Sequence, residues 1–146
     1  MRSPKSARCS RRLRPQRKSK PLRELAFLPI RLMRVVGRSM TPTLKPGELI
    51  FVSAAAYRRR PPRRGELVAA RPAALGGRAL VKRLIGLPRE PVEVDGRRWQ
   101  LGDDQFFLLG DRREQSDDSR TFGPVSRHEL LGPVRLRLWP WKVFTA

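Results

Sequence analysis

Short hydrophobic runs, separated by glycine and proline, dominate the chain from residue 35 onward. The runs at 49–52, 66–70, 79–87 and 106–109 are rich in valine, isoleucine, leucine and phenylalanine. Runs of this length between turn residues are typical of buried or half-buried strands, and no stretch keeps the period of a long helix. The pattern therefore predicts a mainly β domain built of short antiparallel strands.

Two other segments support this prediction. Residues 92–94 and 97–101 flank Asp95 and Gly96, a dipeptide that favours a two-residue hairpin turn. Residues 134–138 alternate apolar side chains with arginine, which is typical of a half-exposed strand. Residues 58–64 hold several arginines and two prolines and are predicted to form a basic loop.

The N-terminal part of the chain has a different composition. Residues 1–20 carry almost no apolar side chains, so we expect a disordered tail. Residues 22–33 are more apolar, but charged residues interrupt them and they fall short of the roughly 18 apolar residues that a membrane span needs. We expect a short helix or a surface-lying segment there. The predicted organisation is a basic tail over 1–34 and a folded domain over 35–146.

The charge of the chain is strongly positive. Lysine and arginine number 33 against 13 acidic residues, for a net charge of +20, and 12 of the basic residues lie in 1–34 with one acid. Such an excess suggests nucleic acid or an anionic membrane as a partner. A nucleic-acid-binding module is therefore one interpretation, although no interleaving of aromatic and basic residues and no groove-binding helix supports it. We expect no nucleic acid as a partner.

Cysteine and histidine are too rare for several kinds of site. The single cysteine, Cys9, excludes an internal disulfide framework and a cysteine-rich zinc site. The single histidine, His128, excludes a histidine metal cage, and its place in a predicted turn favours an exposed side chain. We predict neither a metal nor another cofactor.

The first segment with chemical potential is Gly37–Glu48. Ser39 lies between a flexible glycine and a proline-containing turn, where a serine can be an exposed nucleophile or simply part of a polar loop. The segment is not the nucleophile elbow of α/β-hydrolases, because no glycine follows the serine at the required place.

The second segment is Ala79–Pro88, in which Lys82 is surrounded by apolar residues. If Lys82 points into the domain, burial lowers the pKa of its amine and the neutral amine can act as a general base. Serine–lysine pairs are a known variant of serine–histidine catalysis. If Lys82 points outward instead, it is an ordinary solvated lysine on an alternating strand.

The third segment is Gly110–Val125, which is dense in aspartate and serine. This composition indicates a loop held by its own side-chain hydrogen bonds, with Asp118 and Arg120 as a candidate structural ion pair. A calcium site is a poorer interpretation, since the spacing does not fit the EF-hand pattern and nearby arginines oppose a cation.

In combination the three segments are far more specific than any one of them. Their order is G-x-S-M-x-P-T-L, then V-K-R-x-x-G-x-P, then G-D-x-x-x-x-S-x-D-S-R-x-F-G-P-V. This order resembles the type I signal peptidase family of Ser/Lys endopeptidases, over about residues 35–141. LexA-type autoproteolytic repressors share the first two features but lack the third segment, and they carry a cleavage site upstream of the serine.

The resemblance implies a role for each matching residue. Ser39 would be the nucleophile and would donate its backbone N–H to the oxyanion, and Lys82 would be the general base. Ser116 would hold the Lys82 ammonium, while Asp118 and Arg120 would brace the site. A precursor protein would bind as an extended peptide. The apolar residues that would form pockets for small side chains before the cut are Val35, Met40, Leu44, Leu80 and Val81.

Two positions depart from the family pattern. Gly37 stands where many members have a serine that adds an oxyanion donor, and Arg112 stands where asparagine is usual. The short form and the ending Ser119–Val125 are most similar to the branch that matures the precursor of nickel-containing superoxide dismutase. That branch implies removal of a propeptide in the cytoplasm. The positive charge of the basic tail would in addition allow peripheral contact with anionic membrane. The alternative is a type I signal peptidase that processes secreted precursors at the membrane.

Overall fold

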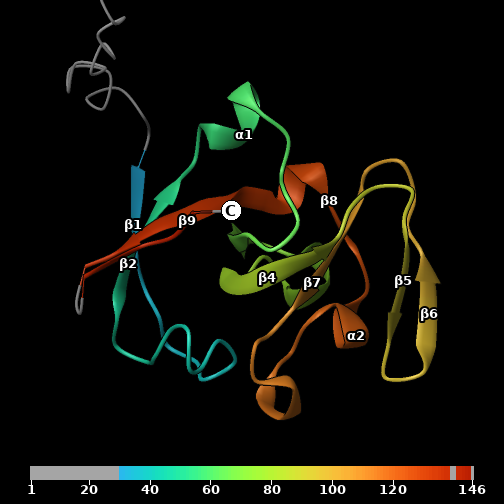
Figure 1. Ribbon diagram of the computed structural model, residues 1–146, viewed down its shortest axis with the longest axis horizontal. Coiled ribbons are helices and arrows are strands. Elements are labelled where there is room, and N and C mark those ends of the chain that lie inside the picture. The colour runs from blue at the N-terminus through green and yellow to red at the C-terminus, as the bar shows by residue number, and fades with distance from the viewer. Residues whose placement is uncertain (1–29, 139–140, 146) are drawn as a thin grey trace, which may run out of the picture.

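The computed structural model describes residues 30–138 and 141–145, and these form a mainly antiparallel β structure (Figure 1). This confirms the predicted fold class. The main sheet has the strand order β1-β2-β9-β3-β4-β7-β8, with β10 paired to β9, and β5 and β6 form a separate hairpin. The strands are β1 Ile30–Arg34, β2 Leu49–Ser53, β3 Leu67–Ala70, β4 Leu80–Gly86, β5 Pro91–Val94, β6 Arg97–Gln100, β7 Gln105–Leu109, β8 Val125–Ser126, β9 Leu130–Arg137 and β10 Lys142–Val143.

The hydrophobic runs became strands at the predicted places. β2, β3, β4 and β7 coincide with the four runs, the hairpin turns at Asp95 and Gly96, and β9 contains residues 134–137 of the alternating segment. Asp95 has a φ of +52° and Gly96 a φ of +72°, as a two-residue turn of this kind requires. The helices are single turns, α1 Ala56–Arg59 and α2 Ser119–Phe122, so part of the predicted basic loop is helical.

The first strand corrects the expectation for the N-terminal region. Residues 30–34 are not helix or tail but pair with β2 in antiparallel register, from Ile30 opposite Ser53 to Arg34 opposite Leu49. No residue of β1 is fully buried, so the sequence lacked the alternation that marks a half-buried strand. The predictions for residues 1–29, including Cys9, lie outside the described residues.

Three hydrophobic clusters stabilise the sheet. One lies under the segment that carries Ser39 and includes Met40, Leu44, Ile50 and Val52. A second fills the centre between β3, β4, β7 and β9 and includes Leu84 and Leu108. The third joins the hairpin β5–β6 to β7 through Val92, Leu101 and Phe107, with Trp99 tilted over Phe107 at a centroid distance of 4.8 Å.

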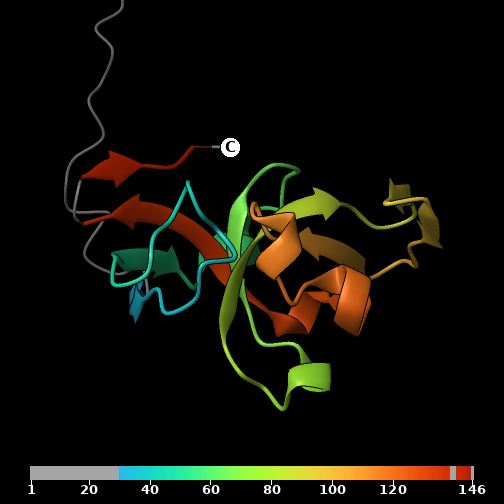
Figure 2. The same ribbon diagram turned by 90° about the horizontal axis from the view of Figure 1, so that it is seen from below.

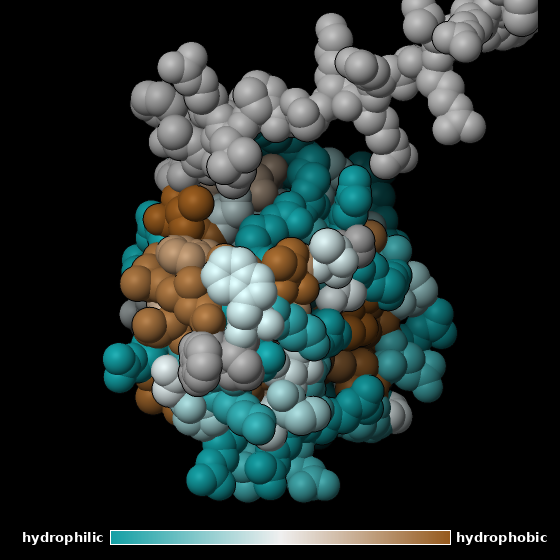
Figure 3. Space-filling view, turned by 60° about the vertical axis from the view of Figure 1, so that its left-hand side comes forward, coloured by the Kyte–Doolittle hydropathy of each residue, from teal (hydrophilic) through white to brown (hydrophobic). Residues whose placement is uncertain are grey.

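The two ends of the sheet differ in their surroundings. The hairpin β5–β6 stands at the end opposite β1 and β2 in both views (Figure 2). At the β1 end, Leu32, Phe51, Leu136 and Val143 face one another across four neighbouring strands. Hydrophobic side chains gather on this side of the molecule (Figure 3). In the described part of the chain, no helix is long and apolar enough to cross a bilayer.

Candidate active site

Ser39 lies in a turn whose neighbours are fixed in the core. Met40 and Leu44 are 2% and 0% exposed, and the backbone N–H of Leu44 donates to the carbonyl of Met40 at 2.8 Å. The carbonyl of Ser39 accepts a hydrogen bond of 2.9 Å from the N–H of Arg112. Ser39 itself remains half-buried, so the turn is anchored below while its hydroxyl stays accessible.

Lys82 is an inward-facing residue of β4. Lys82, Leu84 and Gly86 alternate as the buried positions of this strand, and Lys82 is 3% exposed. The strand is held on both sides, by β3 and β7, and Lys82 itself pairs with Val68. Of the two orientations that the sequence left open for this lysine, the structure has the inward one, and the central strands of the sheet fix its amine.

The two side chains meet at hydrogen-bonding distance. The Nζ of Lys82 lies 2.6 Å from the Oγ of Ser39, although the residues are 43 positions apart in the sequence. Burial lowers the pKa of Lys82 to about 8, while the charges of Asp118 and Asp117 act in the opposite direction. A fraction of the amine is then neutral near physiological pH, which is the form that can accept a proton from a hydroxyl.

Asp118 is a fully buried carboxylate close to this pair. It accepts hydrogen bonds from the N–H of Gly110 at 3.0 Å and from the N–H and guanidinium of Arg120, whose Nε lies 2.9 Å away. Burial alone would raise the pKa of Asp118, but the hydrogen bonds from Arg120 and Gly110 outweigh it and lower the pKa. The predicted Asp118–Arg120 ion pair is thus present in the structure.

Ser116 belongs to the same loop. Its Oγ is buried and has no hydrogen-bond partner in the described residues, so the expected contact with the Lys82 amine is not formed. A Cβ placed on Gly110 would come within 2.1 Å of the Ser116 Oγ and 2.8 Å of the Ser39 carbonyl oxygen. Gly110 therefore allows Ser116 and the nucleophile-bearing turn to approach the end of β7 closely.

A second ion pair, which the sequence did not reveal, lies on the other face of β4. Arg83 donates two hydrogen bonds of 2.7 Å to Asp111, and the Thr43 hydroxyl donates to the same carboxylate at 2.5 Å. These contacts lower the pKa of Asp111 against the effect of its burial. They join three segments that are 28 to 68 residues apart, and they tie the Ser39 turn to β4.

A cleft of about 460 Å³ opens over Ser39 and Lys82. Its walls are residues 33–38 on one side and residues 78–81 on the other, with Gln115 and Asp117 at its edge. Of the predicted pocket residues, Val35, Leu80 and Val81 line this cleft. Met40 and Leu44 do not line it but lie in the core under the Ser39 turn.

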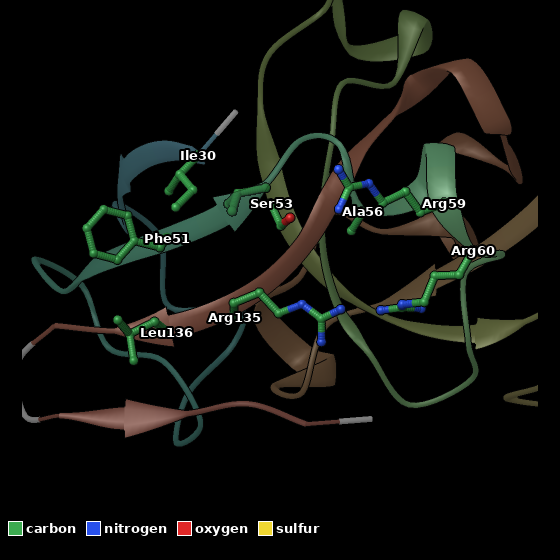
Figure 4. Close-up of a pocket in the computed structure, with 9 residues that line it drawn as sticks. Ile30, Phe51, Ser53, Ala56, Arg59, Arg60, Arg135 and Leu136 are labelled. Carbon is green, nitrogen blue, oxygen red and sulfur yellow. The ribbon is translucent and has the colours of Figure 1, made fainter. Parts of the chain in front are cut away.

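A larger groove of about 750 Å³ lies between β1, β2, α1 and β9 (Figure 4). Its floor is apolar and includes Phe51 and Leu136, and its rim carries Arg59, Arg60 and Arg135. Ser53 is the only hydroxyl-bearing side chain among its lining residues, and none of these residues is a lysine or a histidine. The groove thus lacks a nucleophile–base pair, unlike the cleft over Ser39.

The remaining candidates lie away from the cleft. His128 is in a single 3-10 turn, Arg127–Glu129, and its ring contacts the hydroxyl of Ser126 at 2.9 Å. Among the described residues, no group of three or more histidine, cysteine, aspartate or glutamate side chains is placed to hold a metal ion.

The family model for "Signal peptidase, peptidase S26" matches residues 24–101 and 94–139 of the chain. The chain belongs to this family. Signal peptidase I from Leptolyngbya laminosa is 33% identical over 73% of this chain and 67% of its own length. A probable signal peptidase I from Synechocystis is 35% identical over 73% of this chain and 62% of its own length. Signal peptidase IB from Staphylococcus aureus is 28% identical over 75% of this chain and 78% of its own length.

The members of this family are serine endopeptidases, so the chain is an enzyme of that class. The chain spans about two thirds of the length of the first two relatives. A solved signal peptidase I from Enterococcus faecalis aligns with 51% of this chain and 97% of that chain, at 24% identity and a TM-score of 0.43.

Proposed function

We propose that this protein cleaves an N-terminal extension from precursor proteins, with Ser39 as the nucleophile and Lys82 as the general base. The observation that carries the proposal is the 2.6 Å contact between the Lys82 Nζ and the Ser39 Oγ at the floor of an open cleft. No histidine takes part in it, and the lowered pKa of Lys82 supports the role of a lysine as the base.

The reaction follows from this pair. The Ser39 Oγ attacks the carbonyl carbon of the scissile bond, while the neutral amine of Lys82 accepts the hydroxyl proton. When the tetrahedral intermediate collapses, the C–N bond breaks and Lys82 returns the proton to the leaving amine. Water then attacks the ester at Ser39, with Lys82 again as the base, and releases the second product and the free serine.

The oxyanion of each intermediate needs a hydrogen-bond donor. Within the described residues the backbone N–H of Ser39 donates no hydrogen bond, so it is available for the developing charge. The neighbouring Gly37 supplies no side-chain donor, and the space where its Cβ would stand is open to 4 Å. We propose that the Ser39 N–H donates the hydrogen bond that stabilises the oxyanion.

Three residues keep the pair in place in this proposal. Asp118, with Arg120, fixes the start of the loop after β7 through the N–H of Gly110. Ser116 packs on Gly110 from the same loop. Since the N–H of Arg112 holds the Ser39 carbonyl, a rigid 110–118 loop determines where the nucleophile lies.

The substrate would bind as an extended strand in the cleft. The backbone segments 33–36 and 79–81 run along the two walls of the cleft, and an extended peptide can form strand-like hydrogen bonds with such segments. Val35, Leu80 and Val81 give the cleft modest apolar surfaces, which suit a small or apolar side chain before the cut. Met40 and Leu44 act indirectly, by packing beneath the Ser39 turn.

Two classes of precursor fit this site. The relatives named as signal peptidases favour a precursor with a signal peptide as the substrate. The likeness of Ser119–Val125 to the maturation branch favours the propeptide of nickel superoxide dismutase as a second candidate, which would be processed in the cytoplasm. Peripheral contact with anionic membrane through the basic residues of 1–34 would be compatible with either substrate.

Two purified substrates separate these candidates. The wild-type chain and the Ser39→Ala variant are incubated with a membrane-inserted secretory precursor and with a nickel superoxide dismutase precursor, and the products are identified by mass spectrometry. Serine-dependent cleavage of the first supports a signal peptidase, and cleavage of the second alone supports the maturation protease. Cleavage of neither, together with tight salt-dependent binding of DNA, would replace the proposal with the nucleic-acid interpretation.

A further inference from the structure

The cleft over the Ser39–Lys82 pair is lined by three arginines. Arg34, Arg38 and Arg78 all line it, and all three are exposed to solvent. Asp117 is the only acidic residue among the lining residues. The rim of the cleft is therefore positively charged even before the amine of Lys82 is protonated.

These arginines are not equivalent in their surroundings. Arg78 lies 3.5 Å from Asp117, and both side chains are about two thirds exposed, at 67% and 68%. Arg34 and Arg38, by contrast, form no ion pair with any acidic residue in the described part of the chain. Two guanidinium groups at the rim are thus available to an incoming ligand.

The position of Arg38 makes it relevant to the reaction. It directly precedes Ser39, and it lies on the segment 33–38 that forms one wall of the cleft. An extended peptide advances about 3.3 Å per residue, so a side chain within about two residues of the scissile bond can reach the guanidinium of a residue next to the nucleophile. Arg34 lies at the end of β1 on the same wall and can act on residues farther from the cut.

We propose that Arg38 and Arg34 are specificity-determining residues that favour precursors with aspartate or glutamate close to the cleavage site. This rests on the proposed peptidase function of the same cleft. A carboxylate beside an arginine forms charge-assisted hydrogen bonds that an amide of the same shape cannot match. Because the arginines are exposed, salt screens the preference, and it acts mainly on the binding of the substrate.

The size of the effect follows from the exposure of the charges. Solvent-exposed ion pairs change equilibria by about two- to five-fold each at low ionic strength. We therefore expect a peptide with aspartate at the responsive position to be cleaved with a kcat/KM about two- to five-fold higher than its asparagine counterpart. The difference should lie in KM, with kcat unchanged, and should shrink at 0.5 M salt.

The test is a set of matched peptides. Aspartate, asparagine or lysine is placed at each of three positions before and after the cut, and each peptide is assayed with the wild type, Arg38→Glu, Arg34→Glu and Arg97→Glu. Arg97 is an exposed residue of β6 and does not line the cleft, so its variant changes the net charge by the same amount without altering the cleft wall. All rates are measured on the high-pH plateau, where Lys82 is neutral.

The preference for aspartate over lysine should reverse in Arg38→Glu at the positions next to the cut and persist in Arg97→Glu. Equal cleavage of the aspartate and asparagine peptides by the wild type, or equal effects of Arg38→Glu and Arg97→Glu, would overturn the inference while the peptidase function stands. If no peptide is cleaved, the proposed function fails. Binding of the labelled peptides to Ser39→Ala, followed by fluorescence anisotropy, reports the charge preference without turnover and must show the same order.

Discussion

The amine of Lys82 and the hydroxyl of Ser39 lie 2.6 Å apart because two differently anchored segments meet there. Lys82 is fixed by a central strand of the sheet, and Ser39 by a turn whose next residue, Met40, is buried in the core. Neither position depends on a flexible loop alone. The pair is therefore organised before any substrate binds.

The first prediction concerns the pH dependence of cleavage. Burial lowers the pKa of Lys82 to about 8, and only the neutral amine can accept the serine proton. The rate of cleavage should rise with pH, reach half of its maximum near pH 8 and then level off. Initial rates for one peptide between pH 6 and 10 measure this profile. A flat profile between pH 7 and 9 would contradict the role of Lys82 as the base.

The second prediction concerns stability and uses Lys82→Met, which keeps most of the side-chain volume. Because the pKa of Lys82 is lower in the folded state than the usual 10.5, the unfolded chain binds more protons between about pH 8 and 10.5. The contribution of Lys82 to the free energy of unfolding therefore increases as the pH rises through this window, by about 3 kcal/mol in total. Below pH 8 Lys82 is largely protonated in the folded protein, and the burial of its ammonium group lowers the free energy of unfolding.

Denaturant unfolding at pH 7 and pH 10 checks this. The stability of Lys82→Met relative to the wild type should be highest at pH 7 and should fall by pH 10. The comparison between the two proteins cancels the titration of other groups. A stability difference that does not change with pH would mean that Lys82 has an ordinary pKa in the folded protein.

The sequence was sufficient for those features that local patterns encode. The pattern along β4 left the orientation of Lys82 open, and it was the order of the three motifs that predicted its pairing with Ser39. The Arg83–Asp111–Thr43 contacts were not predicted, since they join segments that only the folded sheet brings together. β1 was missed because Leu32 and Met33 are adjacent between two arginines, which breaks the alternation expected of a half-buried strand.

The third prediction concerns Asp118→Asn. The carboxylate is fully buried and paired with Arg120, so its loss should destabilise the protein by about 3 kcal/mol. The negative charge of Asp118 also raises the pKa of Lys82 against the effect of burial. In the fraction that folds, the midpoint of the pH–rate profile should therefore move to lower pH.

Asp103→Asn is the matched control for this variant, since Asp103 is 80% exposed and its pair with Arg89 lies on the surface. Asp103→Asn should lower the free energy of unfolding by less than about 1 kcal/mol and leave the midpoint of the pH–rate profile unchanged. Thermal unfolding and the pH–rate profile are measured for both variants. An unshifted or higher midpoint in Asp118→Asn would show that Asp118 does not act on the amine of Lys82.

The fourth prediction concerns Gly110→Ala. The added methyl group would collide with the Ser116 Oγ at 2.1 Å and the Ser39 carbonyl oxygen at 2.8 Å, so the turn that carries the nucleophile has to shift. A displacement of about 1 Å at a reacting group can cost about 100-fold in rate. We expect such a loss in kcat, measured on one peptide at saturating concentration.

Gly102→Ala is the control for the added methyl group. The new Cβ would meet only the side chain of Gln105, at 3.4 Å, far from the cleft. This variant should keep the wild-type kcat. Equal activity of both variants would show that the close packing at Gly110 does not position Ser39.

The central claim is that Ser39 and Lys82 act as one catalytic pair. It is tested most directly by measuring kcat for Lys82→Arg, Lys82→Met and Ser39→Ala on a single precursor peptide. Circular dichroism verifies that each variant is folded. Guanidinium stays protonated at any pH compatible with folding, so Lys82→Arg cannot accept the serine proton. The account predicts folded variants that all lose at least about 100-fold in kcat, with Ser39→Ala inactive. Cleavage by a folded Ser39→Ala or Lys82→Arg variant at the wild-type rate would contradict it.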